Sequence, residues 1–379
     1  MARLAARVAD LVGSPVRDML KVAEVPGMIS FAGGLPAPES FSPLDFHEAP
    51  AEVLQYGPSE GDRAFREAVA AELGAIGLPD DPDRLLILSG SQQGIDLAAK
   101  LAVEPGTRLG VQDACYLAAL QVFRLFGAEF VPLASLLAGE GPAPSLAYIN
   151  PTFQNPTGAC AALAERQALA EACQRHDCIL FEDDPYRDLD FEPVERRPVA
   201  SFIDKGSFIY QGSFSKTVAP GLRLGFLTAS PDLLPKLVHL KQAADLHTNR
   251  LSQWLVLQRL QAPDRLARVD ANRTLYRQRR DHFAAELSRL FADLADWEAP
   301  SGGFFFWLRL KGEVDASALL PAAIRRGVLF TPGVHFEPFR IGPSPTLRLN
   351  FGYVTPEIAT RGLTILADLI REDRARQAA

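Results

Sequence analysis

Between residue 85 and about residue 230, short apolar runs alternate with amphipathic stretches. The runs are continuously hydrophobic, which is typical of strands buried on both faces of a mostly parallel sheet. The stretches at 92–103, 117–126 and 161–176 repeat their apolar positions with the period of a helix. We therefore expect strands at 85–88, 109–111, 128–133, 146–150, 178–181, 208–211 and 224–228, with helices between them.

The alternation of short apolar runs with amphipathic stretches ends near residue 230. A long helical region is predicted to about residue 293, and further strands are predicted at 303–310, 327–331 and 346–351, with helices at 315–326 and 356–373. The first 44 residues precede the alternation, and we expect them to join this second layer. The predicted fold is α/β. It has a large domain at 45–260, whose mostly parallel seven-stranded sheet lies between helices, and a smaller split α+β domain formed by 1–44 with 261–379.

Composition narrows the range of functions. The 379 residues are 22% charged and 47% hydrophobic, as in ordinary globular proteins. The net charge of −7 disfavours nucleic acid or an anionic membrane as a partner. The sequence contains neither a signal-peptide pattern nor a long uncharged apolar run, so we expect a cytoplasmic protein with no membrane span. The four cysteines lack zinc-ligand spacing, so neither a metal site nor a disulfide is expected.

Two segments that follow predicted strands carry candidate chemistry. In GSFSKTVAPGLRLG (212–225), Lys216 lies among hydroxyl residues and precedes Arg223. A neighbouring cation lowers the pKa of a lysine, which suits a Schiff-base role, although a single lysine in a turn is more often a surface residue. In FEDDPY (181–186), an aspartate at a strand end is suited to pair with a protonated ring nitrogen. An acidic metal cluster or a polar turn is the alternative there, and a metal would need more ligands.

Two further segments offer polar groups to a ligand. In INPTFQNPTG (149–158), Asn155 lies in a rigid turn after a strand and can present its amide to a ligand oxygen; a purely structural turn is the alternative. In LSGSQQGI (88–95), Ser91 begins a helix whose free N–H groups favour a phosphate. Ordinary helix caps look the same, and the spacing of a P-loop is absent.

Taken together, these segments resemble the fold type I pyridoxal phosphate enzymes, specifically the class I/II aminotransferases. SFSKTVAPGLRLG, QNPTG and EDDPY are similar to the cofactor motifs of that family, and the resemblance runs from about residue 14 to 360. SPVRDML and ISFAGGLP near the N-terminus are similar to the 2-aminoadipate/kynurenine aminotransferase branch. The resemblance implies pyridoxal 5′-phosphate as cofactor, a homodimer, and transfer of an amino group from an L-amino acid to a 2-oxo acid, with 2-oxoglutarate expected, by a ping-pong mechanism.

The resemblance also assigns roles to residues around the cofactor. Lys216 matches the Schiff-base lysine that shuttles the substrate proton, and Asp183 matches the carboxylate that keeps the pyridine nitrogen protonated. Asn155 and Tyr186 match the pair that binds the phenolic oxygen. Tyr116 lies where the family stacks an aromatic ring, although QDACYLAAL departs from the usual form of that segment. The implied phosphate cup consists of Ser91, Gln92, Ser213, Ser215 and Arg223.

Other matches concern the substrate and the second subunit. Arg348 matches the arginine that binds the substrate α-carboxylate, where a bidentate pair fixes orientation as well as charge; Asn155 lies beside it in the family. Arg17 is a candidate for a distal carboxylate or, alternatively, an exposed helix residue. Gly33 and Gly34 are expected to line the substrate pocket. Tyr56 matches a tyrosine that reaches the phosphate in the neighbouring subunit.

Two alternatives remain at the level of sequence. The same scaffold supports lyases and decarboxylases, and a non-catalytic effector-binding homologue is conceivable. Regulators that fuse this fold to a winged DNA-binding domain share the motif style, but the resemblance begins near residue 14 and leaves no room for such a domain. The connection between Phe130 and Tyr148, which contains AGEGPAPS, is shorter than usual for the branch.

Overall fold

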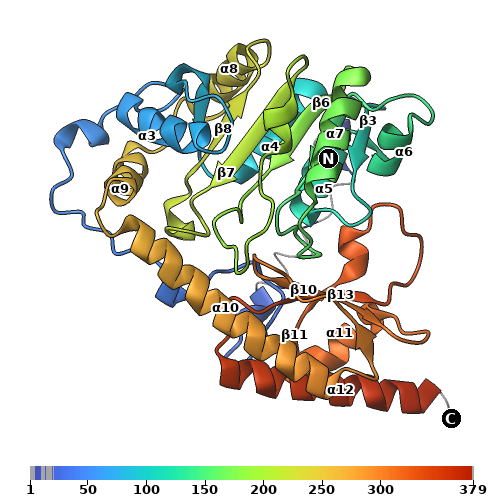
Figure 1. Ribbon diagram of the computed structural model, residues 1–379. Coiled ribbons are helices and arrows are strands. Elements are labelled where there is room, and N and C mark those ends of the chain that lie inside the picture. The colour runs from blue at the N-terminus through green and yellow to red at the C-terminus, as the bar shows by residue number, and fades with distance from the viewer. Residues whose placement is uncertain (1–4, 10–12, 14–18, 20, 378–379) are drawn as a thin grey trace.

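A seven-stranded sheet forms the centre of the larger part of the molecule (Figure 1). The structure is a computed structural model that describes residues 5–9, 13, 19 and 21–377. The sheet order is β2-β8-β7-β6-β5-β3-β4, and only β8 runs antiparallel to its neighbours. Each strand lies at a predicted run, which confirms the α/β fold. The strands are β2 (Leu85–Leu88), β3 (Arg108–Val111), β4 (Glu129–Pro132), β5 (Leu146–Ile149), β6 (Ile179–Asp183), β7 (Phe208–Ser213) and β8 (Gly225–Ala229).

Helices cover both faces of this sheet because successive strand residues point to opposite sides. One face packs against α3 (Arg63–Gly74), α7 (Leu163–Arg175) and α9 (Arg250–Leu260). The other face packs against α4 (Ser91–Ala102), α5 (Leu117–Leu125) and α8 (Leu234–Asp245). The short helix α6 (Leu133–Ala138) was not predicted; it begins where the predicted strand at 128–133 ends. The helices expected at 92–103, 117–126 and 161–176 are confirmed as α4, α5 and α7.

The long helix α10 (Arg265–Leu290) leads from the large sheet to the second layer (Figure 1). There, a four-stranded sheet has the order β12-β13-β10-β9, and α11 and α12 pack beside it. These elements are β9 (Ala295–Asp296), β10 (Phe305–Leu310), α11 (Ala316–Arg325), β12 (Thr331–Pro332), β13 (Thr346–Asn350) and α12 (Pro356–Gln377). Short elements complete the described chain: α1 (Ala6–Ala9), η1 (Pro38–Ser40), η2 (Ala51–Leu54), η3 (Pro82–Arg84), η4 (Val199–Phe202), η5 (Pro220–Leu222) and η6 (Gly333–Phe336). Within the residues that the structure describes, no helix is long and apolar enough to cross a membrane.

The N-terminal segment is tied to this second layer. Strand β1 (Ile29–Ser30) pairs in parallel with β11 (Val328–Leu329). Phe31 follows it, is fully buried, and contacts the Phe283 ring edge-on at 5.5 Å between centroids. A Cβ added to Gly362 of α12 would lie 2.6 Å from the Phe31 ring, so α12 also packs closely on this residue. The contacts agree with the expected pairing of the first residues with the C-terminal part, while the domain boundaries at 44/45 and 260/261 stay a prediction.

We expect Phe31→Ala to lower the free energy of unfolding by about 3–5 kcal/mol, because it leaves a cavity beneath β1 and between α10 and α12. Ile341→Ala is the control, since Ile341 is fully exposed and its loss should change stability by about 0.5 kcal/mol or less. Denaturant unfolding of both variants tests this. Equal stability of the two variants would contradict the anchoring role of Phe31.

Candidate active site

The four segments singled out in the sequence meet at the carboxyl edge of the large sheet. Asp183 ends β6, Asn155 lies in the turn after β5, and Ser213 ends β7. Ser91 begins α4 directly after β2. Ligands of open α/β sheets bind at this edge, so the topology gathers these side chains where a small molecule can reach them.

Lys216 lies in the turn after β7 and reaches toward the N-terminal segment. Its Nζ donates a hydrogen bond of 2.7 Å to the backbone carbonyl of Gly34. Burial, and then the positive charges of Arg348 and Arg223, lower the pKa of Lys216 to about 8. A substantial fraction of the amine is therefore uncharged slightly above neutral pH, which is the form that attacks a carbonyl carbon.

Asp183 is held at both carboxylate oxygens. The Tyr148 hydroxyl donates to Oδ2 at 2.7 Å, and the Gln211 side-chain amide donates to Oδ1 at 2.8 Å. Burial raises the pKa of Asp183 to about 6, and these two hydrogen bonds oppose that rise. The sequence analysis missed both donors. The available signal was the position of Tyr148 in the apolar run of β5 and of Gln211 in that of β7. Buried polar groups need hydrogen-bond partners, so each of these residues called for one.

Asn155 connects the two layers. Its Oδ1 accepts a hydrogen bond of 2.6 Å from Arg348 of β13, and its own backbone N–H donates to Asn150 at 2.7 Å. Its side chain also shares a hydrogen bond with the buried Tyr186.

Tyr116 immediately precedes α5, and burial followed by the negative charge of Asp183 raises its pKa to about 12. Burial also raises the pKa of Tyr186, so both tyrosines are neutral at physiological pH and keep a hydroxyl proton to donate.

Arg348 is enclosed by two aromatic rings. Its guanidinium carbon lies 4.3 Å from the ring centroid of Phe305 and 4.8 Å from that of Phe336. It also donates to the carbonyl of Ala32, while its buried Nε has no hydrogen-bond partner. Burial lowers the pKa of Arg348 to about 10, so it remains a cation at neutral pH. A buried cation with a free donor fits a carboxylate ligand.

A cradle for an anion lies at the start of α4. Gly90 precedes the helix with a φ of +84°, and a Cβ added there would lie 2.4 Å from Arg223 Nη2. The Arg223 guanidinium therefore lies directly over the turn that carries Ser91, and Gln92 is the next helical residue. Across the turn after β7, Ser213 Oγ accepts a hydrogen bond of 3.2 Å from the Ser215 backbone. A helix start, hydroxyls and a cation together suit a phosphate.

The remaining predicted residues occupy different surroundings. The Gly33 carbonyl accepts a hydrogen bond of 2.7 Å from Asn350, and a Cβ added to Gly34 would lie 3.4 Å from the Phe305 ring. Tyr56 is 76% exposed and contacts the His247 ring, so within one chain it takes no part in the cluster around Lys216. Arg17 lies outside the described residues.

These residues fit a ring-shaped carbonyl cofactor with a phosphate. The cradle at Gly90 supplies the phosphate contacts, Lys216 supplies an amine for the carbonyl, and Asp183 supplies an acceptor for a ring nitrogen. The hydrogen-bonded Asn155 and Tyr186 supply donors for a phenolic oxygen. Among the described residues, no group of His, Cys, Asp or Glu is arranged to hold a metal ion.

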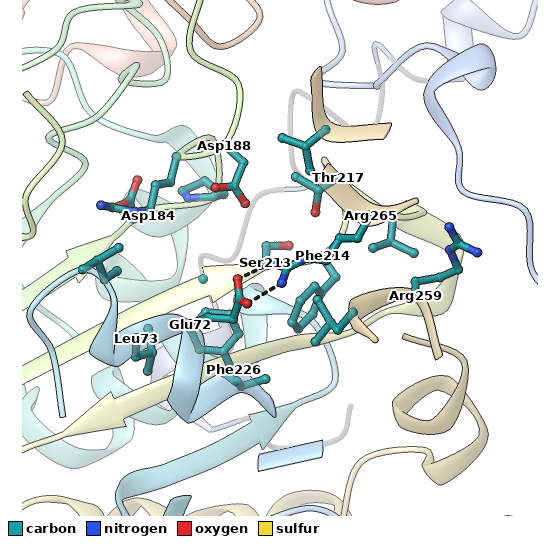
Figure 2. A pocket seen from close by; sticks show the side chains of 18 of the residues that line it. Glu72, Leu73, Asp184, Asp188, Ser213, Phe214, Thr217, Phe226, Arg259 and Arg265 are labelled. Atoms are coloured by element: carbon teal, nitrogen blue, oxygen red, sulfur yellow. Dashed lines mark hydrogen bonds and ion pairs between the residues drawn. The ribbon is translucent and has the colours of Figure 1, made fainter. Parts of the chain in front are cut away.

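A cavity of about 140 Å³ lies between α3, the end of β7 and the start of α10 (Figure 2). Ser213, Phe214 and Thr217, which flank Lys216 in the sequence, line it, but Lys216 and Asp183 do not. Figure 2 shows the ion pair of Glu72 with Arg265 in this cavity, which joins α3 to the start of α10. The acidic residues of 181–186 are thus divided, because Asp183 faces the candidate site whereas Asp184 lines this separate cavity.

Comparisons with known proteins agree with this site. The profile of the family "Aminotransferase class I and II" matches residues 37–366. The chain is 33% identical to aromatic-amino-acid aminotransferase 1 of Thermococcus litoralis, with 97% of this chain and 94% of the relative covered. It is 34% identical to the 2-aminoadipate transaminase of Thermus thermophilus, with 94% of each covered. The crystal structure of Pyrococcus horikoshii kynurenine aminotransferase superposes with a TM-score of 0.88 at 30% identity, covering 98% of this chain and 97% of that one.

The lowered pKa of Lys216 gives a testable expectation for the cofactor-free protein. We expect the rate of Lys216 acylation by acetic anhydride to rise with pH around a midpoint near 8, because only the uncharged amine reacts. Arg348→Met should move the midpoint upward, since it removes a cation that disfavours protonation. Peptide mass spectrometry measures the modification, with the exposed Lys205 as the internal reference. The same midpoint in wild type and variant would contradict the electrostatic coupling.

Proposed function

The chain belongs to the aminotransferase class I and II family, and we propose that it moves the amino group of an L-amino acid to 2-oxoglutarate. It is a pyridoxal 5′-phosphate-dependent aminotransferase of fold type I. The observation that carries the specific proposal is the buried Arg348. It lies beside Asn155 with its Nε unpartnered, and its positive charge lowers the pKa of Lys216. A carboxylate bound there would place its α-carbon near a lysine that is ready to move a proton.

Each residue then has a stated task. Pyridoxal 5′-phosphate supplies an aldehyde that accepts the amino group and a ring that withdraws electrons from the bonds at the substrate α-carbon. Lys216 would hold the cofactor through its amine and, once released by a substrate, move the proton at the α-carbon. Arg348 would fix the α-carboxylate. Asp183 would keep a proton on the ring nitrogen, and the cradle of Ser91, Gln92, Ser213, Ser215 and Arg223 would hold the phosphate.

The proposed amino donor is an L-amino acid with an extended side chain, as in the names of the relatives. Their names specify aromatic amino acids, 2-aminoadipate and kynurenine, each with an extended side chain. In this chain, the absence of a side chain at Gly34 leaves space beside Phe305. Arg17 is the proposed partner of a distal carboxylate on a dicarboxylic substrate such as 2-oxoglutarate. We place the reaction in the cytoplasm. Transamination is favoured over elimination or decarboxylation because the relatives named above are aminotransferases.

We also propose a homodimer with shared active sites. Tyr56 and Leu54 are 76% and 79% exposed in the single chain and lie only two residues apart, as expected of side chains that a partner covers. Leu54 ends η2, and Tyr56 lies on the connection from η2 to α3. A second copy that covers this connection would bring its Tyr56 to the phosphate of the first site.

The reaction is tested with a panel of L-amino acids and 2-oxoglutarate. We expect glutamate formation with aromatic amino acids, kynurenine or 2-aminoadipate. Turnover should fall by about 10⁴-fold or more in Lys216→Ala, since this variant loses the amine proposed both to hold the cofactor and to move the α-carbon proton. Arg17→Ala should raise the KM for 2-oxoglutarate and leave that for glyoxylate unchanged. Release of ammonia or carbon dioxide without glutamate would instead support a lyase or a decarboxylase.

The subunit arrangement is tested with Tyr56→Phe. Loss of the hydroxyl should weaken pyridoxal 5′-phosphate binding about tenfold, the value of one hydrogen bond to a charged group, without changing the mass measured by light scattering. Tyr353→Phe is the matched control, because Tyr353 is also exposed but lies in the second layer. A monomeric wild-type protein, or a Tyr56→Phe variant that binds the cofactor as tightly as wild type, would refute the arrangement.

A further inference from the structure

Asp183 has neighbours on both adjacent strands that contact it directly. In the parallel pair β6–β7, Gln211 is the register partner of Asp183. In the pair β5–β6, Tyr148 is the partner of Phe181, two residues before Asp183 and therefore on the same face of the sheet. Both side chains are buried, with 1% of Tyr148 and none of Gln211 exposed. Strand register alone thus brings one donor to each side of the carboxylate.

Neither donor has freedom to turn away. The Tyr148 ring packs edge-on against Phe123 and Phe181, with centroid distances of 5.6 and 5.3 Å. The Gln211 amide lies against α4, where a Cβ added to Gly94 would be 2.0 Å from its Oε1. With the oxygen facing α4, the NH₂ group faces Asp183. The opposite amide orientation would place two oxygens in contact, so the carboxylate itself determines the orientation.

We propose that Tyr148 and Gln211 are positioning residues that hold Asp183 as an anion and turn its carboxylate to the ring nitrogen of the cofactor. The proposal rests on the proposed function, because it assigns these residues a role toward pyridoxal 5′-phosphate. Its physical basis is that both neighbours only donate to Asp183. A carboxylate that accepts two hydrogen bonds is favoured as the anion, and an anion in turn favours a protonated ring nitrogen.

Gly94 connects the contacts around Asp183 with the proposed phosphate cradle at the start of α4. It lies on α4, one turn after Ser91, so the helix that offers its first residues to the phosphate also provides the surface against which Gln211 packs. The absence of a side chain at position 94 is therefore required by Gln211 and not by the backbone, because Gly94 is an ordinary helical residue. The contact connects the two ends of the cofactor site through a single side chain.

The test compares two ligands that differ at one atom. The cofactor-free protein is titrated with pyridoxal 5′-phosphate and with its 1-deaza analogue, in which carbon replaces the ring nitrogen. We expect Tyr148→Phe and Gln211→Leu to weaken binding of the natural cofactor by about tenfold or more, the value of a hydrogen bond to a charged group. Binding of the analogue should change by less than about twofold, because it offers no proton to Asp183.

Tyr210→Phe is the matched control. Tyr210 is equally buried and donates to an aspartate, Asp184 Oδ2, at 3.0 Å, but on the other face of the sheet. Its loss should affect the two ligands alike. Gly94→Ala provides a second route to the same effect, since the added methyl group displaces the Gln211 amide without removing it, and it should reproduce the discrimination seen with Gln211→Leu.

The possible results are distinguishable. Equal weakening of both ligands in Tyr148→Phe and Gln211→Leu would show a merely structural role and overturn the proposal. Unchanged binding of both ligands would overturn it as well. A wild-type protein that binds neither ligand would instead refute the proposed function. If Tyr148→Phe does not fold, as judged by circular dichroism, Gln211→Leu and Gly94→Ala carry the test.

Discussion

The gathering of three charged groups between the large sheet and the second layer is the constraint on which this structure depends. Asp183 and Arg348 are buried and Lys216 is half-buried, and the loss of water is costly for a charge unless polar groups replace the lost hydration. Among the described residues, none of the three forms an ion pair with another side chain. Each is held by neutral groups instead: a carbonyl for Lys216, a hydroxyl and an amide for Asp183, and an amide oxygen and a carbonyl for Arg348. Their charges consequently remain available to a ligand.

That arrangement requires contributions from distant parts of the chain. The carbonyls of Ala32 and Gly34 belong to the N-terminal segment, which reaches the sheet edge only because β1 pairs with β11 and Phe31 is anchored between α10 and α12. Arg348 comes from β13, and the rings of Phe305 and Phe336 hold it in place from both sides. The site thus lies between the large sheet and the second layer. Any movement of one relative to the other changes the distance between Arg348 and Lys216, and with it the electrostatic contribution to the pKa of Lys216.

The sequence predicted the large sheet well and its polar details poorly. Continuous apolar runs identify buried strands, and all seven lie where the pattern indicated. The two-residue strand β1 was not predicted, because two residues carry no periodicity and its partner β11 is about 300 residues away. Lys216, Asp183, Asn155 and Arg348 were proposed from motifs, and the structure places them together. Tyr148 and Gln211 were missed because a polar group inside an apolar strand signals the need for a partner but does not identify that partner.

The run Glu182-Asp183-Asp184 shows how strand geometry assigns roles to similar residues. All three carboxylates are buried, yet alternation along β6 sends Asp183 to the face that carries Tyr148 and Gln211 and sends Glu182 to the opposite face, where it accepts the Ala200 N–H at 2.9 Å. Burial and the nearby Asp184 raise the pKa of Glu182 to about 7, and the backbone N–H groups of Ala200 and Val199 oppose that rise. Asp184 turns to Tyr210 beyond the strand end. A one-residue shift in register would exchange these surroundings. The pairing of β5, β6 and β7 therefore determines which of the three carboxylates faces Tyr148 and Gln211.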